Sequence, residues 1–170
     1  MIARAPVPTR FSRAAPWIST LVRWVLAGIF LAAGGLKAVD PQSSVAAVRA
    51  YQLLPARLET VIGWGLPFVE IALGLLLAAG AFTRVAGAAS ALLLVVFILA
   101  VLSAAARGLS IDCGCFGGGG TVAAGQTDYG GEVVRDSLLL LLALWLLWQP
   151  RSRLALEPGP HERRELEDNQ

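Results

Sequence analysis

Residues 85–105 of the chain read VAGAASALLLVVFILAVLSAA and carry no charged side chain. A helix needs about 20 mostly apolar residues to cross the roughly 30 Å of hydrocarbon in a bilayer, so this stretch predicts a membrane-spanning helix. Three other apolar stretches approach the same length, at about residues 17–36, 61–79 and 133–148. The sequence therefore predicts an all-α fold, a polytopic membrane bundle of four helices.

The composition indicates that lipid is the solvent of this protein. Apolar residues make up 56% of the chain and charged residues 15%. Soluble domains contain about 45–50% and about 25% of these classes. The formal net charge is only +2, and the basic residues are scattered around the apolar stretches. We therefore expect the lipid bilayer, and no nucleic acid, among the partners.

The basic residues favour a multi-pass arrangement in the bacterial plasma (inner) membrane with both termini in the cytoplasm, because cytoplasmic loops are richer in arginine and lysine. This arrangement places nine basic residues inside and five outside. The expected organisation is a cytoplasmic segment 1–16, a transmembrane domain 17–149 and a disordered cytoplasmic tail 150–170. The tail is polar, charged and interrupted by Pro158 and Pro160.

The connections between the spans differ in character. Residues 40–60 carry Val45, Val48 and Leu53 at roughly helical spacing, which predicts a short amphipathic helix on the outer surface. The short connection at residues 80–84 predicts that the second and third spans form a hairpin.

The longest loop, residues 106–132, contains both cysteines of the chain in the string CGCFG at residues 113–117. In the expected orientation the loop faces an oxidising compartment, where disulfides persist. Residues i and i+2 can approach the Cα separation of a disulfide, about 4.4–6.8 Å, and Gly114 can adopt angles that help the small ring to close. Strained, exposed disulfides exchange readily, so we predict that Cys113 and Cys115 are redox-active.

Two other interpretations of the cysteine pair are open. The first is an inert pair of thiols or a disulfide that braces the loop, although a bridge between i and i+2 closes almost no loop. The second is a metal site, because two thiolates can hold copper(I) or contribute to a zinc site. Zinc takes about four ligands, and the one histidine, His161, lies on the opposite side of the expected membrane. No metal site is therefore predicted.

Polar groups also interrupt the apolar spans. Glu70 lies near the middle of the second span, where a carboxyl is costly, so it should face the bundle interior. It is either a proton relay or headgroup contact for a membrane electron carrier, or a structural hydrogen bond between helices. Arg135 and Asp136 precede a short apolar run and should lie near the cysteine loop, as site residues or as an interfacial cap. Asp112 beside Cys113 should disfavour the Cys113 thiolate.

Parts of the sequence resemble known membrane proteins. The strings RWVLAG at 23–28, GLK at 35–37 and DP at 40–41 resemble the first helix of DoxX-like proteins. From the pattern of spans, Lys37 and Asp40 are expected to mark an outer helix end. The strings YQLLP at 51–55 and LPFVE at 66–70 resemble the second helix of the methylamine utilisation MauE branch. The CGCFG string and the following Arg135-Asp136 are similar to the redox loop of that branch.

The resemblance implies a four-helix membrane protein associated with thiol redox chemistry and a thioredoxin-fold partner on the outer face. Members of this branch serve the maturation of methylamine dehydrogenase, which is one candidate client. Cys113 and Cys115 would be the reacting residues of a thiol–disulfide oxidoreductase component. The supporting loop residues would be Asp112, Gly114, Phe116, Gly117, Arg135 and Asp136.

The sequence leaves several features of this function open. A membrane quinone is a candidate electron carrier, and the direction of electron flow is not visible. Because Asp112 should disfavour the thiolate of the neighbouring Cys113, the sequence weakly favours Cys115 as the sulfur of lower pKa. The alternatives are a non-catalytic DoxX-like scaffold subunit of an oxidoreductase complex, and a metal-ion carrier, which the lack of further soft ligands disfavours.

Overall fold

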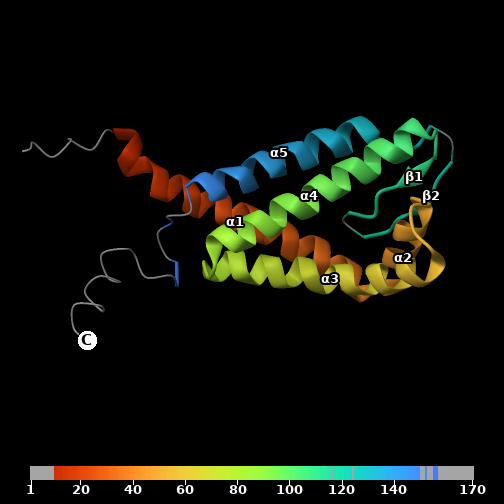
Figure 1. Cartoon of the computed structure of the whole chain (residues 1–170), viewed down its shortest axis with the longest axis horizontal. Coiled ribbons are helices and arrows are strands. Elements are labelled where there is room, and N and C mark those ends of the chain that lie inside the picture. The colour runs from red at the N-terminus through yellow and green to blue at the C-terminus, as the bar shows by residue number, and fades with distance from the viewer. Residues whose placement is uncertain (1–9, 116, 124, 150–151, 153–154, 157–170) are drawn as a thin grey trace, which may run out of the picture.

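The computed structural model contains five helices and one short hairpin among the residues that it describes (Figure 1). The elements are α1 (Arg10–Val39), α2 (Pro41–Ala50), α3 (Ala56–Ala79), α4 (Thr83–Ala106), β1 (Ile111–Asp112), β2 (Gly120–Thr121) and α5 (Tyr129–Trp148). The described residues are 10–115, 117–123, 125–149, 152 and 155–156. The predicted segment 1–16 lies largely outside this part of the chain, as does most of the predicted tail 150–170.

Three helical segments are long and apolar enough to cross a membrane, namely Ala15–Val39, Ala56–Ala79 and Thr83–Ala106. The predicted all-α membrane fold is confirmed in this form. Helix α5 has 20 residues, or about 30 Å of rise, but charged residues occupy its first half. Its apolar half exposes Leu138 and Leu141 by 58% and 62%, as a lipid-facing helix would. A fourth span at α5 stays a prediction.

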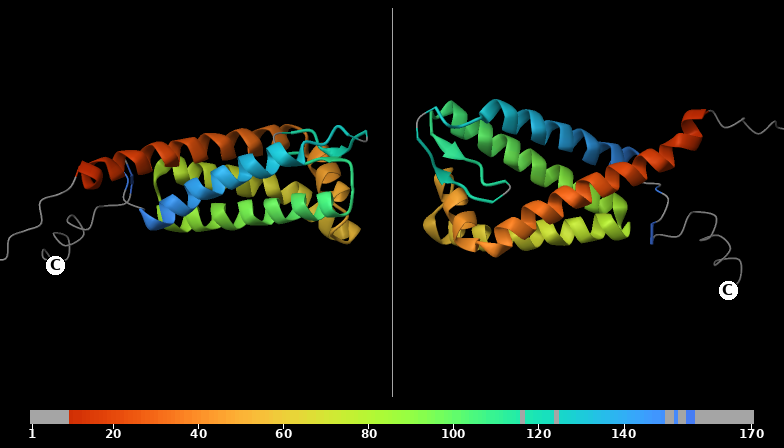
Figure 2. Two further views of the ribbon diagram at one scale, coloured as in Figure 1. Left: turned by 90° about the horizontal axis from the view of Figure 1, so that it is seen from above. Right: turned by 180° about the vertical axis from the view of Figure 1, so that it is seen from behind.

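The long helices pack as two pairs, with α1 along α3 and α4 along α5 (Figures 1 and 2). Small residues allow the close approach of α1 and α3, as is common between helices in lipid. A Cβ atom on Gly34 would lie 2.8 Å from the Pro67 carbonyl oxygen, and one on Gly74 would lie 2.7 Å from Leu31 Cγ. These two glycines therefore set the spacing of the first pair.

Helices α3 and α4 meet at a tight turn and diverge toward the opposite end of the molecule (Figure 1). Gly80 ends α3 in the left-handed conformation, with φ +66°, a common helix terminator. Fully buried apolar residues such as Leu26, Leu77 and Leu146 fill the bundle core. The predicted hairpin is present, but its arms separate where α2 and the cysteine loop lie. The diverging helices α3 and α4 therefore enclose a wedge-shaped region at that end, where α2 and the cysteine loop lie.

Helix α2 confirms the predicted short helix between the first two spans. Asp40 caps it, since its Oδ1 accepts a hydrogen bond from the Ser43 backbone N–H at 3.2 Å, and a proline occupies the first helical position. Its buried face packs on α3, where Ser44 Oγ donates to the Gly63 carbonyl oxygen at 2.8 Å. Val45 belongs to this face, whereas Leu53 lies beyond the helix and is exposed.

Candidate functional site

The cysteine loop is held between the two strands of a small antiparallel hairpin. Ile111 pairs with Thr121, and Asp112 pairs with Gly120. Ile111 is buried against Ala50 of α2 and against α4, which anchors the hairpin to the helices. The chain between the strands then turns inward into the wedge of the bundle (Figure 2). The sequence predicted only an irregular loop here, because strands of two residues show no periodicity.

Gly114 allows the loop to lie directly on α2. Its φ is +66°, and a Cβ atom at this position would lie 2.6 Å from the Ala47 Cβ atom. Both the backbone angle and the contact favour glycine over any other residue. Gly117 has a positive φ as well, +83°, and Phe116 lies outside the described residues. The positive φ angles of these glycines thus determine the path of the loop. Such backbone freedom was expected from the sequence at Gly114.

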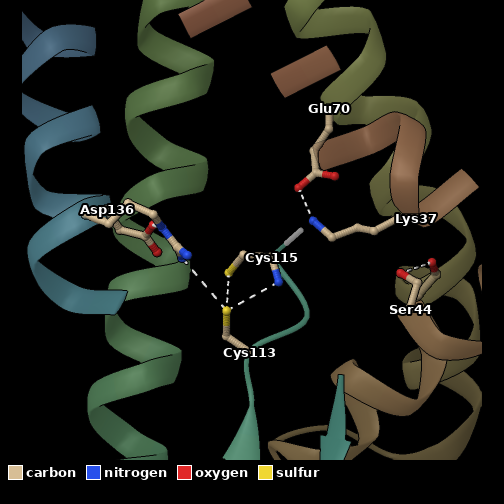
Figure 3. Close-up of polar contacts among 8 residues, drawn as sticks. Lys37, Ser44, Glu70, Cys113, Cys115 and Asp136 are labelled. Atoms are coloured by element: carbon tan, nitrogen blue, oxygen red, sulfur yellow. Dashed lines mark hydrogen bonds and ion pairs between the residues drawn. The ribbon is translucent and has the colours of Figure 1, made fainter. Parts of the chain in front are cut away.

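Cys113 and Cys115 are both free thiols with half-buried side chains. Their sulfur atoms lie 2.7 Å apart, and the Cys115 backbone N–H donates to Cys113 Sγ at 3.3 Å (Figure 3). The Arg135 guanidinium points at the same sulfur, with Nη2 at 3.8 Å from Cys113 Sγ. The two thiols can therefore react with each other with little movement of the backbone.

The surroundings distinguish the two sulfurs. The hydrogen bond between the two thiols lowers the pKa of Cys113, burial raises it, and the Cys115 backbone N–H and Arg135 lower it further, so that the net shift is downward. The same thiol–thiol hydrogen bond, together with burial, raises the pKa of Cys115. Cys113 is thus the sulfur that ionises first.

This order reverses the one expected from the sequence, where Asp112 was expected to favour Cys115. The Asp112 carboxylate is engaged by the loop itself, because Oδ1 accepts a hydrogen bond from the Gly114 N–H at 3.1 Å. The donors to Cys113 come from Arg135 and from the backbone of Cys115, and neither contact is visible in a linear sequence. These contacts favour Cys113 as the sulfur of lower pKa, the opposite of the order expected from Asp112 alone.

Arg135 and Asp136 lie beside the loop, as expected. Arg135 Nε donates to Asp136 Oδ1 at 2.9 Å, and the Asp136 side chain is 4% exposed. Asp136 Oδ2 has no hydrogen-bond partner among the described residues. Helix α5 begins at Tyr129, earlier than expected, because Asp128 accepts a hydrogen bond from the Gly131 N–H at 3.0 Å and caps it. The aspartate before an apolar run was the signal that sequence reasoning missed.

A buried ion pair lies on the other side of the loop. Lys37 Nζ of α1 donates to Glu70 Oε1 of α3 at 2.5 Å, and their side chains are 4% and 1% exposed (Figure 3). Glu70 therefore faces the bundle interior, as predicted. Lys37 does lie in the last turn of α1, but its side chain turns inward, 5.6 Å from the centre of the Phe97 ring of α4. Sequence reasoning missed this pairing, although Lys37 is the one lysine of the chain.

Two cavities adjoin the cysteine pair. The larger, about 330 Å³, lies among α2, α3, α4 and the loop, and both sulfur-bearing residues and Lys37 line it. The smaller, about 30 Å³, is lined by Glu70, Arg135, Asp136 and Cys115 together with apolar side chains. Cys115 therefore lines both cavities.

One group near the loop offers atoms that a metal could bind. Asp112, Cys113 and Glu132 each place one potential ligand atom within 4.8 Å of the others. Glu132 was not singled out from the sequence. Zinc takes about four ligands, and a single thiolate with two carboxylates mixes soft and hard donors. The described residues thus offer an incomplete set, and the site is better described by its two sulfurs.

The fold and the site together define a class: a multi-pass helical membrane protein with a paired-cysteine loop folded into one end of its bundle. The sequence model of the family described as "Methylamine utilisation protein MauE" matches residues 15–149. The chain therefore belongs to the MauE family, and this confirms that part of the resemblance. No curated protein and no solved structure shows a significant match. The likeness to DoxX-like proteins stays a prediction.

Proposed function

We propose that this protein is the membrane component of a thiol–disulfide exchange system that serves methylamine utilisation. Cys113 and Cys115 alternate between a dithiol and a disulfide on the outer face of the bacterial plasma membrane. The observation that carries the proposal is the contact of the two sulfurs, 2.7 Å apart, beside the Arg135 guanidinium. Membership of a family described by methylamine utilisation supports the setting. The maturation of methylamine dehydrogenase is the proposed use.

The proposed partner is a thioredoxin-fold protein on the outer face, and exchange proceeds through a mixed disulfide. One thiolate of the reduced partner attacks Cys113, the sulfur that lies beside the Arg135 guanidinium. The Cys113–Cys115 bond breaks, and Cys115 leaves with the electron pair and takes up a proton. The second partner thiolate then attacks the partner sulfur of the mixed disulfide and releases Cys113 as a thiolate. Arg135 stabilises that thiolate.

The roles of the two cysteines can be separated by trapping. Cys115→Ser should accumulate a mixed disulfide between Cys113 and a thioredoxin-fold protein. The Cys113 thiolate attacks the disulfide of the oxidised partner, one partner sulfur leaves as a thiolate, and Cys115 is no longer present to displace the partner from Cys113. Cys113→Ser should trap no such adduct. Non-reducing gels of membranes, followed by mass spectrometry of the adduct, measure both outcomes, and the double serine variant is the control. Serine variants that trap nothing and support full methylamine-dependent growth would favour the alternative, a non-catalytic scaffold subunit.

The proposed orientation has a separate test. The described ends of α1 and α5 and the turn between α3 and α4 lie at one end of the molecule, and the cysteine loop lies at the other (Figure 1). Because nine basic residues fall in the segments assigned to the cytoplasm and five in the outer ones, we propose that both termini are cytoplasmic and the cysteines external. A membrane-impermeant maleimide should label Cys113 in intact, mildly reduced cells, with the double serine variant as background. Labelling that appears only after the membrane is opened would reverse the orientation.

A further inference from the structure

We infer that the larger cavity binds the headgroup of a lipid-soluble quinone, which accepts the electrons of the Cys113–Cys115 dithiol. This inference rests on the proposed exchange function and names its electron acceptor and the place where it binds. The cavity, about 330 Å³, has both cysteines and Lys37 in its wall. That volume falls at the lower end of the roughly 300–1,000 Å³ of small-molecule pockets. A cavity of this volume can hold the single ring of a quinone headgroup.

Apart from Ser44 and Tyr51, the other side chains of the cavity wall are apolar, and the cavity opens toward lipid. Ile62 of α3 and Val96 of α4 line the cavity and are also 40% and 52% exposed. The mouth therefore lies between these two helices, where they diverge from their common turn (Figure 1). Since α3 and α4 are long and apolar enough to span a membrane, this mouth faces acyl chains. A ligand with an apolar tail can enter sideways and leave its tail in the bilayer.

Lys37 supplies the polar contact that a quinone headgroup needs. An ammonium group has three N–H donors, and among the described residues Lys37 Nζ donates one hydrogen bond, to Glu70 Oε1. The remaining donors can bind a quinone carbonyl oxygen. A fixed positive charge at this position stabilises the negative charge that develops on the oxygen during reduction. Glu70 holds the ammonium group in place.

The chemistry balances for a quinone as the oxidant. The two S–H bonds of Cys113 and Cys115 break, one S–S bond forms, and two electrons and two protons are released. The quinone takes up both electrons, and its two carbonyl oxygens take up two protons to give the quinol. The disulfide that forms is the species that the thioredoxin-fold partner reduces again. A one-electron metal centre would have to accept the two electrons of the dithiol in two separate steps. A quinone accepts both electrons and becomes the quinol.

The test uses the full-length protein in lipid nanodiscs, reduced and then mixed anaerobically with decylubiquinone. Loss of the quinone absorbance and mass-spectrometric detection of the Cys113–Cys115 disulfide should rise together, one disulfide per quinone. Ala100→Phe fills the cavity from α4 and should slow this reaction by about tenfold or more. Ala88→Phe, the same change at an exposed position of α4 that does not line either cavity, should leave it unchanged.

A second readout separates this inference from the exchange function. Oxidation of the dithiol by a glutathione redox buffer does not need the cavity, so Ala100→Phe should match the wild type in that assay. A wild-type pair that cycles with glutathione but is not oxidised by decylubiquinone would overturn the quinone site and leave the exchange function standing. Equal quinone rates for Ala100→Phe and Ala88→Phe would overturn the site as well. A pair that does not cycle with glutathione would overturn the exchange function itself.

Discussion

Lys37→Met is expected to lower the free energy of unfolding by about 3–5 kcal/mol, the cost of removing one partner of a buried ion pair. Lys37 and Glu70 are 4% and 1% exposed, and their charged atoms lie 2.5 Å apart. Without Lys37, the Glu70 carboxylate loses the one ion-pair partner that it has among the described residues. Reversible unfolding in mixed micelles, followed by circular dichroism at neutral pH, measures the loss. The loss should shrink as the pH falls, because protonation of Glu70 removes the unpaired charge.

The double variant Lys37→Met/Glu70→Met is the matched control. It removes both charges, and an apolar replacement of a buried pair is often neutral or stabilising. We therefore expect it to recover most of the stability lost in Lys37→Met. A double variant whose loss equals the sum of the two single losses would show that the ion pair does not couple α1 to α3 energetically.

The sequence predicted those parts of the fold that depend on composition and local pattern. The apolar stretches located α1, α3 and α4, and the need to bury a carboxyl predicted the inward direction of Glu70. The short helix α2 followed from apolar spacing between polar residues. These features need no knowledge of the neighbouring elements, since the bilayer and the helix period determine them.

The features that were missed depend on how the elements meet. Lys37 turns inward because Gly34 brings α1 against α3 one turn earlier, so that its side chain reaches Glu70. The loop folds back into the bundle because α3 and α4 diverge, and because Gly114 can lie against Ala47. None of these contacts has a signature within a short window of sequence. The juxtaposition of the cysteine pair with an ion pair and an apolar cavity thus emerged only from the packing.

Arg135 is expected to control the reactivity of Cys113, and Arg135→Met should slow alkylation of this thiol at neutral pH. Arg135 Nη2 lies 3.8 Å from Cys113 Sγ, and this contact is one of the causes that lower the Cys113 pKa, after the hydrogen bond between the two thiols. A lowered pKa keeps the thiolate present at a lower pH. Removing the guanidinium raises the pKa of Cys113. As the pH falls, the Cys113 thiolate is then protonated at a higher pH than in the wild type. At a fixed pH below the pKa, each unit by which the Cys113 pKa rises reduces the thiolate fraction about tenfold.

The measurement is the rate of Cys113 alkylation by iodoacetamide between pH 5 and pH 10, a range of about five units around the usual thiol pKa, with peptide mapping to separate the two cysteines. The midpoint of the rate profile should move upward in Arg135→Met and less in Arg135→Lys, which keeps the charge but loses the planar donors. Arg107→Met is the control, because Arg107 donates to the Tyr51 and Ser103 carbonyl oxygens and not to either sulfur. If Arg135→Met and Arg107→Met give the same profile, Arg135 does not stabilise the Cys113 thiolate, and the reactivity of Cys113 depends on the contacts within the loop, such as the Cys115 backbone N–H.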